Sequence, residues 1–321
     1  MTSAETTGSV PARLKRLKPR RRSRSGEGLG GFWSALPFLA VGLILYGTLL
    51  LYPVVESIGL SFFHWDGIGP KTFAGLWNYK ELFTTDPFFK VAFRNTLIWT
   101  GLSVLVPNLL GLGLAVALNG KVRGRLALRA VFYLPAVMAT VVVAMTWNLV
   151  YEPSIGLFSS VLRFIGLGGE VRPWLGDPAV VLVAVFIAAV WQGTGISMVL
   201  FLAGLQSVRT DLIDAARVDG AGRASVFRHV ELPALRPTTV VVLMLSVVNA
   251  LKGFDLIYAM TQGGPAGSSE VLSLYAWTSA VTDREFGIGS AVATLLLIMT
   301  LIAIIPYIRW AFRNMSLGEN R

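Results

Sequence analysis

Six apolar stretches, each about as long as a lipid bilayer is thick, limit what this chain can fold into. A helix needs roughly 20 apolar residues to cross the hydrocarbon core of a bilayer, and six runs reach about that length. Only 14% of the residues are charged, whereas a soluble domain carries about 25%. The sequence therefore predicts an all-α polytopic membrane protein with six transmembrane helices, at about residues 32–52, 89–118, 130–150, 178–202, 238–260 and 288–307.

The placement of Lys and Arg predicts which side of the membrane each loop faces. Six spans put the segments 1–31, 121–129, 203–237 and 309–321 on one side, and these hold twenty of the 28 basic residues. The loops on the other side hold six. Because cytoplasmic loops are enriched in Lys and Arg, both termini are predicted to be cytoplasmic. The net charge of +10 is thus explained by membrane topology and does not indicate nucleic-acid binding.

The two ends of the chain are predicted to lie outside the membrane domain. Residues 1–31 are rich in Arg, Lys, Ser, Gly and Pro, a composition that does not pack a core, so we expect a disordered cytoplasmic tail. The apolar run that follows is too long for the core of a signal peptide and lacks a small-residue cleavage site. Residues 32–312 are predicted to form the membrane domain, and residues 313–321 a second cytoplasmic tail.

A polar stretch, residues 211–237, separates the fourth and fifth apolar runs. It predicts a short helix over 211–219 with Thr210 as its N-cap, ended by Gly220, since glycine readily takes the left-handed conformation that terminates helices. A second helix is predicted over 223–231, ending before Pro233. Ala215 and Ala216 leave the first helix with a thin, smooth side against which another protein can pack closely.

This stretch resembles the cytoplasmic signature loop of the membrane subunits of binding-protein-dependent ABC importers. The family pattern is Glu-Ala-Ala, three residues, Gly, nine residues and Ile-x-Leu-Pro, and the chain matches its spacing without a gap. Asp214 stands in place of Glu, and Val230 in place of Ile. The resemblance implies a type I importer permease whose coupling loop, residues 204–237, contacts an ATPase through Asp214, Ala215, Ala216, Asp219, Gly220, Ala221, Leu232 and Pro233.

Three further motifs extend the resemblance over about residues 33–312. NTLIWT after residue 94, FYLPAV in the third span and TQGGPAGSSE after the fifth span are similar to the sugar-type branch of the family, the maltose and glycerol-3-phosphate permeases. The resemblance therefore implies that the chain forms half of a translocation pore for an oligosaccharide or a glycerol-phosphate-like solute. It does not identify that solute.

The energy source of such an importer is predicted to lie on other subunits. A phosphate-cradling loop needs Gly, four residues and Gly-Lys-Ser/Thr, and the single Gly-Lys pair here is followed by Val122. The chain is therefore expected not to be an enzyme, and to hold no cofactor while ATP binds its partners. With no cysteine, thiolate metal sites are excluded, and no metal site is expected. The family implies a homologous second permease, two cytoplasmic ATPases and an extracytoplasmic solute-binding protein, all at the cell membrane.

Polar residues inside the apolar runs are candidates for the substrate pathway, because burying such groups in a membrane is costly. In the fifth span they recur every three residues, which predicts one shared helix face. Aromatic rings and amides of the third and fourth spans suit sugars, whose C–H faces stack on rings and whose hydroxyls bond to amides. The predicted pathway residues are Trp147, Trp191, Gln192, Asn249, Lys252, Asp255 and Tyr258.

Simpler explanations exist for several of these residues. Lys252 and Asp255 can pair with each other near the outer membrane face, and the two Trp residues can serve as packing or interface anchors. Trp65 and Asp66, in the predicted external loop, are either contacts for the binding protein or part of an ordinary solvated loop.

Two other classes of membrane protein remain as alternatives. A secondary transporter needs no ATPase and commonly carries internal repeats, which this sequence does not show convincingly. A membrane enzyme of the CDP-alcohol phosphotransferase kind needs further acids soon after Asp219 to hold metal ions, and the next ones are Glu231 and Asp255. Neither alternative explains the signature loop.

Overall fold

The computed structural model of the chain describes residues 39–120 and 122–318. The chain divides into two compact units, Met1–Pro53 and Val54–Arg321. The predicted tail 1–31 lies outside the described residues. Within the described part the protein is mostly helical, which confirms the predicted all-α class.

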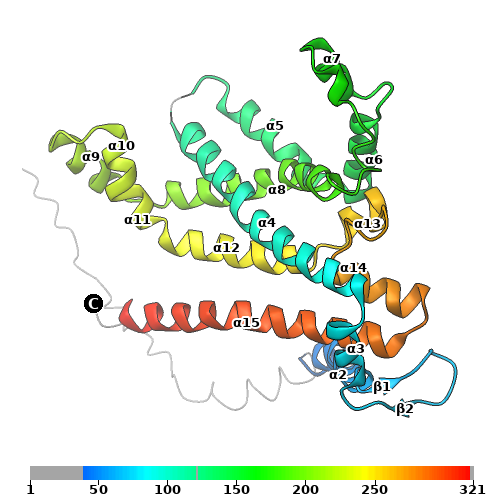
Figure 1. The fold of residues 1–321 in the computed structure, drawn as a ribbon. Coiled ribbons are helices and arrows are strands. Elements are labelled where there is room, and N and C mark those ends of the chain that lie inside the picture. Colours follow the sequence, from blue (N-terminus) through cyan, green and yellow to red (C-terminus); the bar gives the residue numbers. More distant parts are fainter. Residues whose placement is uncertain (1–38, 121, 319–321) are drawn as a thin grey trace, which may run out of the picture. The chain divides into compact units, whose positions relative to one another are not determined.

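The described elements follow one another as shown in Figure 1. They are η1 (Gly47–Leu51), α2 (Tyr52–Leu60), β1 (Phe63–His64), β2 (Thr72–Phe73), α3 (Trp77–Thr84), α4 (Pro87–Asn119), α5 (Arg125–Val137), α6 (Thr140–Tyr151), α7 (Leu157–Phe164), η2 (Gly168–Glu170), α8 (Val181–Gln206), α9 (Thr210–Val218), α10 (Arg223–Val226), η3 (Phe227–Glu231), α11 (Leu232–Ala234), α12 (Arg236–Leu251), α13 (Asp255–Thr261), α14 (Leu272–Trp277), η4 (Thr278–Thr282) and α15 (Phe286–Gly318).

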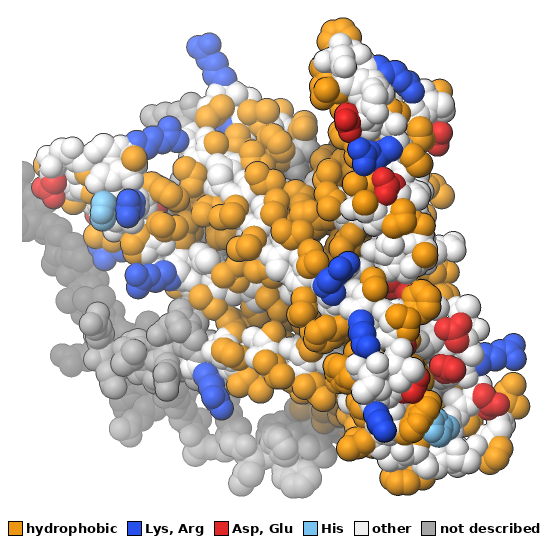
Figure 2. Space-filling view, in the orientation of Figure 1, with side chains coloured by type: hydrophobic (Ala, Val, Ile, Leu, Met, Phe, Trp, Pro, Cys, Tyr) orange, Lys and Arg blue, Asp and Glu red, His pale blue; other side chains and the backbone are white. Residues whose placement is uncertain are grey.

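Four described helices are long and apolar enough to cross a membrane, and two bent helix pairs raise the number to as many as six. The four are Leu39–Leu60, Pro87–Asn119, Val181–Gln206 and Phe286–Tyr307. The pairs are Arg125–Val137 with Thr140–Tyr151, bent by 101°, and Arg223–Ala234 with Arg236–Leu251, bent by 66°. Hydrophobic side chains cover the surface over the long helices in Figure 2, as expected for helices that face lipid.

The third predicted span is not one straight helix. Residues 130–150 are continuously apolar, yet the chain turns sharply between α5 and α6, where Met138 and Ala139 are extended. Pro135 lies in the last turn of α5 and has no backbone N–H to donate. A hydropathy pattern cannot reveal such a bend, because the apolar character continues through it.

Two helices continue through prolines where the sequence predicted their ends. The first span runs past Pro53 to Leu60 instead of ending at residue 52, and the helix of the signature loop runs past Pro233 to Ala234. In both places a π-helical turn, η1 or η3, directly precedes the segment that contains the proline. A π-turn shifts the hydrogen-bond register locally, so the helix continues although proline donates no bond.

The segment between the first two long helices contains a small hairpin that was not predicted from the sequence. Strands β1 and β2 pair antiparallel, with Phe63 opposite Phe73 and His64 opposite Thr72. Helix α3 follows, and Asp86 then caps α4 by accepting hydrogen bonds from the N–H groups of Phe88 and Phe89. These two strands are the only sheet in the described residues.

Helix α8 packs closely against α4 and α5 through glycines. A Cβ at Gly111 would lie 2.6 Å from the Ser197 Cβ and 2.7 Å from the Met198 nitrogen, and a Cβ at Gly195 would lie 2.5 Å from the Phe132 carbonyl oxygen. Small residues let membrane helices approach closely, and in lipid this packing drives helix association. Half of the apolar window of α8 is accordingly buried.

A polar triad joins three helices within this core. Ser197 of α8 donates to the Asn108 Oδ1 at 2.6 Å, and the Asn108 Nδ2 donates to the Ser246 Oγ of α12 at 2.9 Å. Asn108 and Ser197 are both buried. Because hydrocarbon offers no alternative partner, these bonds fix the relative register of α4, α8 and α12.

We predict that Asn108→Leu lowers the stability of the folded protein by about 1 kcal/mol, the size of an interhelical hydrogen bond in a membrane. The measurement is thermal unfolding of the detergent-solubilised protein. Thr100→Val is the matched control on the same helix, because the buried Thr100 Oγ1 has no hydrogen-bond partner in the described part of the chain and its loss costs no hydrogen bond there. Equal melting temperatures for Asn108→Leu and the wild type would show that the triad does not hold the helices together.

Candidate functional site

A cavity of about 520 Å³ lies where α12 gives way to α13. Helices α4, α8 and α12 contribute most of its wall, and the ends of α5, α6 and α13 complete it. Its polar lining residues are Trp99, Ser103, Thr140, Gln192, Ser197, Ser246, Asn249, Lys252 and Asp255.

The break between α12 and α13 is held from two sides. Helix α12 ends at Leu251 and α13 begins at Asp255. The Ser273 hydroxyl donates to the Gly253 carbonyl oxygen at 3.1 Å, and a Cβ at Gly253 would lie 2.7 Å from the Trp99 Nε1. Only glycine therefore fits beneath the indole. The break between α12 and α13 is thus held in place by its packing against Trp99 and its hydrogen bond from Ser273.

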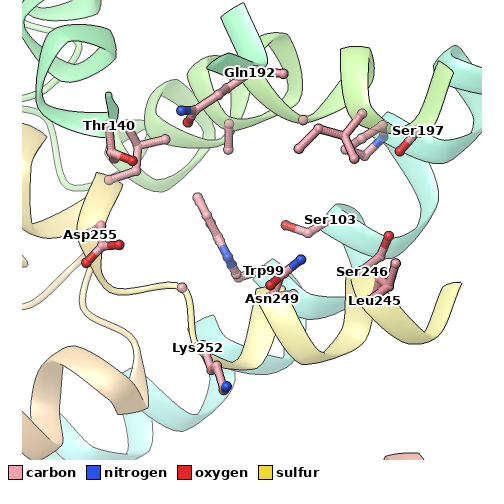
Figure 3. Close-up of a pocket in the computed structure, with 18 of the residues that line it drawn as sticks. Trp99, Ser103, Thr140, Gln192, Ser197, Leu245, Ser246, Asn249, Lys252 and Asp255 are labelled. Carbon is pink, nitrogen blue, oxygen red and sulfur yellow. The ribbon is translucent and has the colours of Figure 1, made fainter. Parts of the chain in front are cut away.

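Four of the seven predicted pathway residues line this cavity: Gln192, Asn249, Lys252 and Asp255. Gln192 and Asn249 lie on opposite sides of it in Figure 3, whereas the Lys252 side chain points away from the other labelled polar groups. Gln192 also donates to the Met138 carbonyl oxygen at 3.3 Å, which ties α8 to the bend between α5 and α6.

The predicted shared helix face is wrong, because the helix ends at Leu251 and Lys252, Asp255 and Tyr258 follow its end. Asn249, Lys252 and Asp255 still meet around the cavity, since the chain bends there. Lys252 and Asp255 form no ion pair among the bridges of the described residues. The simpler explanation of a Lys252–Asp255 pair is thus not what the structure shows.

The three predicted aromatic pathway residues do not line the cavity. Trp147 and Trp191 pack against each other with ring centroids 6.0 Å apart. Tyr258 stacks on Phe254 at 5.1 Å and meets the edge of Trp277 at 5.1 Å. For the two tryptophans, the packing explanation fits this geometry.

The contribution of α4 to the cavity was not predicted from the sequence. Trp99, Ser103 and Pro107 recur every four residues and all face the cavity, as that spacing on one helix face requires. The signal was available, because an indole, a hydroxyl and a proline share this face within an apolar run. Ser246 and Thr140 carried no such signal, since single hydroxyls are common in membrane helices.

The predicted coupling helix is present as α9, with small differences at its start. It begins at Thr210, so Thr210 is its first residue and Arg209, not Thr210, is its N-cap. Gly220 ends it with φ of +83°. The Ala221 N–H donates to the Ala216 carbonyl oxygen and the Gly220 N–H to the Arg217 carbonyl oxygen, which is the hydrogen-bond pattern of a Schellman cap.

Helix α9 turns one side toward its own chain and leaves the other free. Ile213, Arg217 and Ala221 line a second cavity, of about 400 Å³, between this helix and the end of α4. Leu212 and Ala215 are exposed, and no residue of α9 is buried. Asp214 pairs with Arg217 on the helix surface at 3.2 Å. Leu232 and Pro233 are exposed in α11.

Two arginines close the C-terminal end of α4 next to this loop. The Arg129 Nη2 donates to the Leu118 carbonyl oxygen at 2.6 Å, and the Arg223 Nη2 to the Val116 carbonyl oxygen at 3.5 Å. Cations stabilise the C-terminus of a helix, where carbonyls lack intrahelical partners. Arg223 thereby links the signature loop to the helix that carries Trp99 and Ser103.

The Gly-rich loop after α13 is fastened to the opposite end of α4. The Asn95 Nδ2 donates to the carbonyl oxygens of Ser268 and Glu270, both at 2.9 Å, and the Leu272 N–H donates to the Thr96 hydroxyl at 2.8 Å. The motifs NTLIWT and TQGGPAGSSE are thus two halves of one contact. Gln262, Gly263 and Ala266–Gly267 take positive φ within the loop, and these hydrogen bonds hold that backbone in place.

Two carboxyl groups near this end have shifted pKa values. Burial raises the pKa of Glu270 to about 7, and the carboxylates of Asp283 and Asp86 act in the same direction. Raising the pH through that value therefore places a charge under the Gly-rich loop. Hydrogen bonds from the backbone of Gly69 and Ile68 hold the pKa of Asp66 below its usual value.

Residues 108–312 match the family model for the binding-protein-dependent transport system inner membrane component. The chain is 35% identical over 285 residues to a probable ABC transporter permease protein of Pyrococcus horikoshii, covering 88% of this chain and 96% of that one. It is 36% identical over 283 residues to the trehalose/maltose transport system permease protein of Thermococcus litoralis, covering 87% and 92%. A diacetylchitobiose uptake system permease protein of Streptomyces coelicolor is 32% identical over 313 residues, covering 94% and 88%.

Among solved structures, the fold is similar to a chain of a bacterial ABC transporter involved in the import of the acidic polysaccharide alginate. The TM-score is 0.77 at 24% identity, with 88% of this chain and 96% of that chain covered. At this identity the likeness bears on the fold alone.

We predict that Asn95→Asp releases the Gly-rich loop, because a carboxylate would face two carbonyl oxygens that the Asn95 amide now satisfies. Hydrogen exchange of the amides in residues 263–272 should speed up roughly tenfold or more, since two buried acceptors lose their donor. Gln262→Glu is the control, because it adds the same charge at an exposed loop position without touching these bonds. Unchanged exchange in Asn95→Asp would show that the loop is held by other contacts.

Proposed function

The chain belongs to the family of binding-protein-dependent transport system inner membrane components, and from that premise we propose that it forms half of the translocation pore of an ATP-driven carbohydrate importer. Membership makes it a multi-pass protein of the inner membrane and a transport subunit, not an enzyme. Its partners in the proposed assembly are a homologous second permease, two cytoplasmic ATPases and an extracytoplasmic solute-binding protein.

The assignment of a carbohydrate substrate rests on the near full-length similarity to permeases named for trehalose/maltose, diacetylchitobiose and multiple sugars. The cavity supports it. Its lining offers the hydroxyls of Ser103 and Thr140 and the amides of Gln192 and Asn249, which match a polyhydroxyl solute. Because Lys252 points away from these groups, a neutral sugar fits better than a phosphorylated one.

Coupling to ATP hydrolysis is proposed to run through α9. Its free side carries Leu212 and Ala215, and the Schellman cap at Gly220 fixes the angle at which it leaves the loop. A cleft on the ATPase that receives this helix would move it when ATP draws the two ATPases together. Asp214, Ala216, Asp219, Ala221, Leu232 and Pro233 complete the proposed contact.

The basic loops support a cytoplasmic position for this end of the protein, because cytoplasmic loops are enriched in Lys and Arg. Motion of the signature loop then reaches α4 through Arg223, which donates to the Val116 carbonyl oxygen. Helix α4 carries Trp99 and Ser103 to the cavity and Asn95 to the Gly-rich loop. Displacing it therefore changes the cavity wall and the opposite loop together.

We predict that Ala216→Lys and Gly220→Val both uncouple transport from ATP hydrolysis. The lysine puts a long charged chain where a methyl group fits, and a β-branched residue is a poor fit at the positive φ of Gly220. The measurement is recovery of the ATPases with the solubilised permease, together with solute uptake into vesicles that contain the binding protein. Uptake should fall at least tenfold, with the ATPases lost or no longer stimulated.

Gly222→Val is the matched control, because Gly222 has φ of −69° and a Cβ there meets open space, as it does at Gly220. The Gly222→Val variant should retain both ATPases and take up solute as the wild type does. Normal uptake in Gly220→Val and Ala216→Lys would mean that α9 is not the coupling element. A solute gradient that drives uptake without any ATPase would instead favour a secondary transporter.

We predict that Asn249→Leu weakens uptake several-fold while the assembled complex retains its ATPases, because the change removes amide hydrogen bonds to the solute and adds no charge. Uptake of maltose, trehalose and diacetylchitobiose would be measured in vesicles. Asn148→Leu is the control, since Asn148 is exposed on α6 and does not line the cavity. Wild-type uptake of all transported sugars by Asn249→Leu would remove this residue from the pathway.

A further inference from the structure

A separate cavity, of about 280 Å³, lies between the β1–β2 hairpin, α3 and the start of α15. It shares no lining residue with the cavity at the α12–α13 break. In the proposed topology it opens outside the cell. Its lining residues are His64, Trp65, Asp66, Trp77, Asn78, Arg284, Glu285, Gly287 and Ile288.

Close packing fixes the walls of this cavity. The Phe286 N–H donates to the Trp65 carbonyl oxygen at 3.0 Å, which ties the start of α15 to the hairpin. A Cβ at Gly67 would lie 2.5 Å from the Phe286 ring, so that ring leaves no room for a side chain there. On the other wall, the His64 and Trp77 rings meet edge to face at 4.4 Å. The cavity is thus built into the fold.

Asn78 fastens one wall of this cavity. Its Nδ2 donates to the carbonyl oxygens of Ser61 at 2.8 Å and Phe63 at 3.0 Å, which fixes the orientation of the amide. Asn78 is fully buried, and its Oδ1 has no partner among the described residues. Asn78 therefore holds the hairpin against α3 and shapes the wall of the cavity, while its buried side chain lies out of reach of a ligand.

The other lining groups define the class of ligand that suits this cavity. Asp66 uses its Oδ1 for the backbone of Ile68 and Gly69, and Arg284 and Glu285 add charges of opposite sign. The described residues offer no group of three His, Cys, Asp or Glu that suits a metal ion. Mixed charges around aromatic rings favour a neutral ligand with many hydroxyls over an ion.

We propose that this cavity binds one sugar unit of the transported carbohydrate, separately from the cavity in the membrane domain. A pyranose ring lies against the exposed face of Trp77, and its hydroxyls bond to Arg284 and Glu285. The proposal rests on the carbohydrate substrate of the proposed function. It adds a second sugar site on the face of the protein that receives the solute.

The test uses the assembled transporter, with both permeases and both ATPases, in lipid nanodiscs without its binding protein. Saturation-transfer NMR with maltose, trehalose and diacetylchitobiose detects weak binding of each sugar. We expect a signal from at least one sugar, and roughly a fivefold weaker affinity in Trp77→Ala, the size expected for losing one aromatic contact. Glu285→Gln, a smaller change at an exposed side chain, should also weaken binding.

Phe73→Ala is the matched control, because Phe73 is an exposed aromatic residue of the same hairpin that does not line the cavity. It should bind as the wild type does. No signal from any of the three sugars, or unchanged affinity in both Trp77→Ala and Glu285→Gln, would overturn the proposal.

Sugar uptake by the complete transporter separates this proposal from the proposed function. Normal uptake with no Trp77-dependent NMR signal would refute only the second sugar site. Reduced uptake in Trp77→Ala with unchanged sugar binding would also refute it, because the cavity would then receive the binding protein. Failure to import any carbohydrate would refute the proposed function itself.

Discussion

The break between α12 and α13 depends on a constraint that lipid imposes: each backbone N–H and C=O at membrane depth needs a partner within the protein. At this break the backbone groups find partners in local turns and in one hydrogen-bond donor from a distant residue. The N–H groups of Lys252 and Gly253 bond to the carbonyls of Val248 and Ala250, and Ser273 donates to Gly253. Trp99 closes the remaining space. Irregular backbone is tolerated at such depth where it lines a cavity, and here it does.

Helix α4 connects the three functional regions of the protein. Its 33 residues extend for roughly 50 Å at 1.5 Å per residue. One end meets the signature loop through Arg223, the middle lines the cavity with Trp99 and Ser103, and the other end holds the Gly-rich loop through Asn95. A movement that starts at α9 therefore needs no chain of flexible contacts, because one stiff element touches each region in turn.

The sequence predicted the elements that depend on local chemistry and missed those that depend on distant partners. The bounds of α4 to within two residues, the presence of α8, and the left-handed Gly220 that ends α9 followed from hydropathy and glycine's backbone freedom. The interrupted fifth span did not, because its cause is an indole more than 150 residues earlier in the chain. The helix ends predicted at Pro53 and Pro233 were wrong for a similar reason. A π-turn precedes each proline and accommodates its missing N–H, and the sequence pattern does not reveal this turn. Trp147 and Trp191 show the converse, since their aromatic character suited sugars but their rings pack against each other.

The exposure of α9 is hard to reconcile with a chain that acts alone. A helix of nine residues is too short to be stable in water by itself and needs tertiary packing. Its own chain faces it on one side only, across the cavity that Ile213 and Arg217 line. Leu212 and Ala215 stay exposed, although the Schellman cap at Gly220 orders the helix up to its last residue. An ordered helix with a free apolar side, between loops that are otherwise polar, is the arrangement expected where a second protein completes the packing. This supports the proposed ATPase contact independently of the signature motif, because it follows from exposure and helix length rather than from residue spacing.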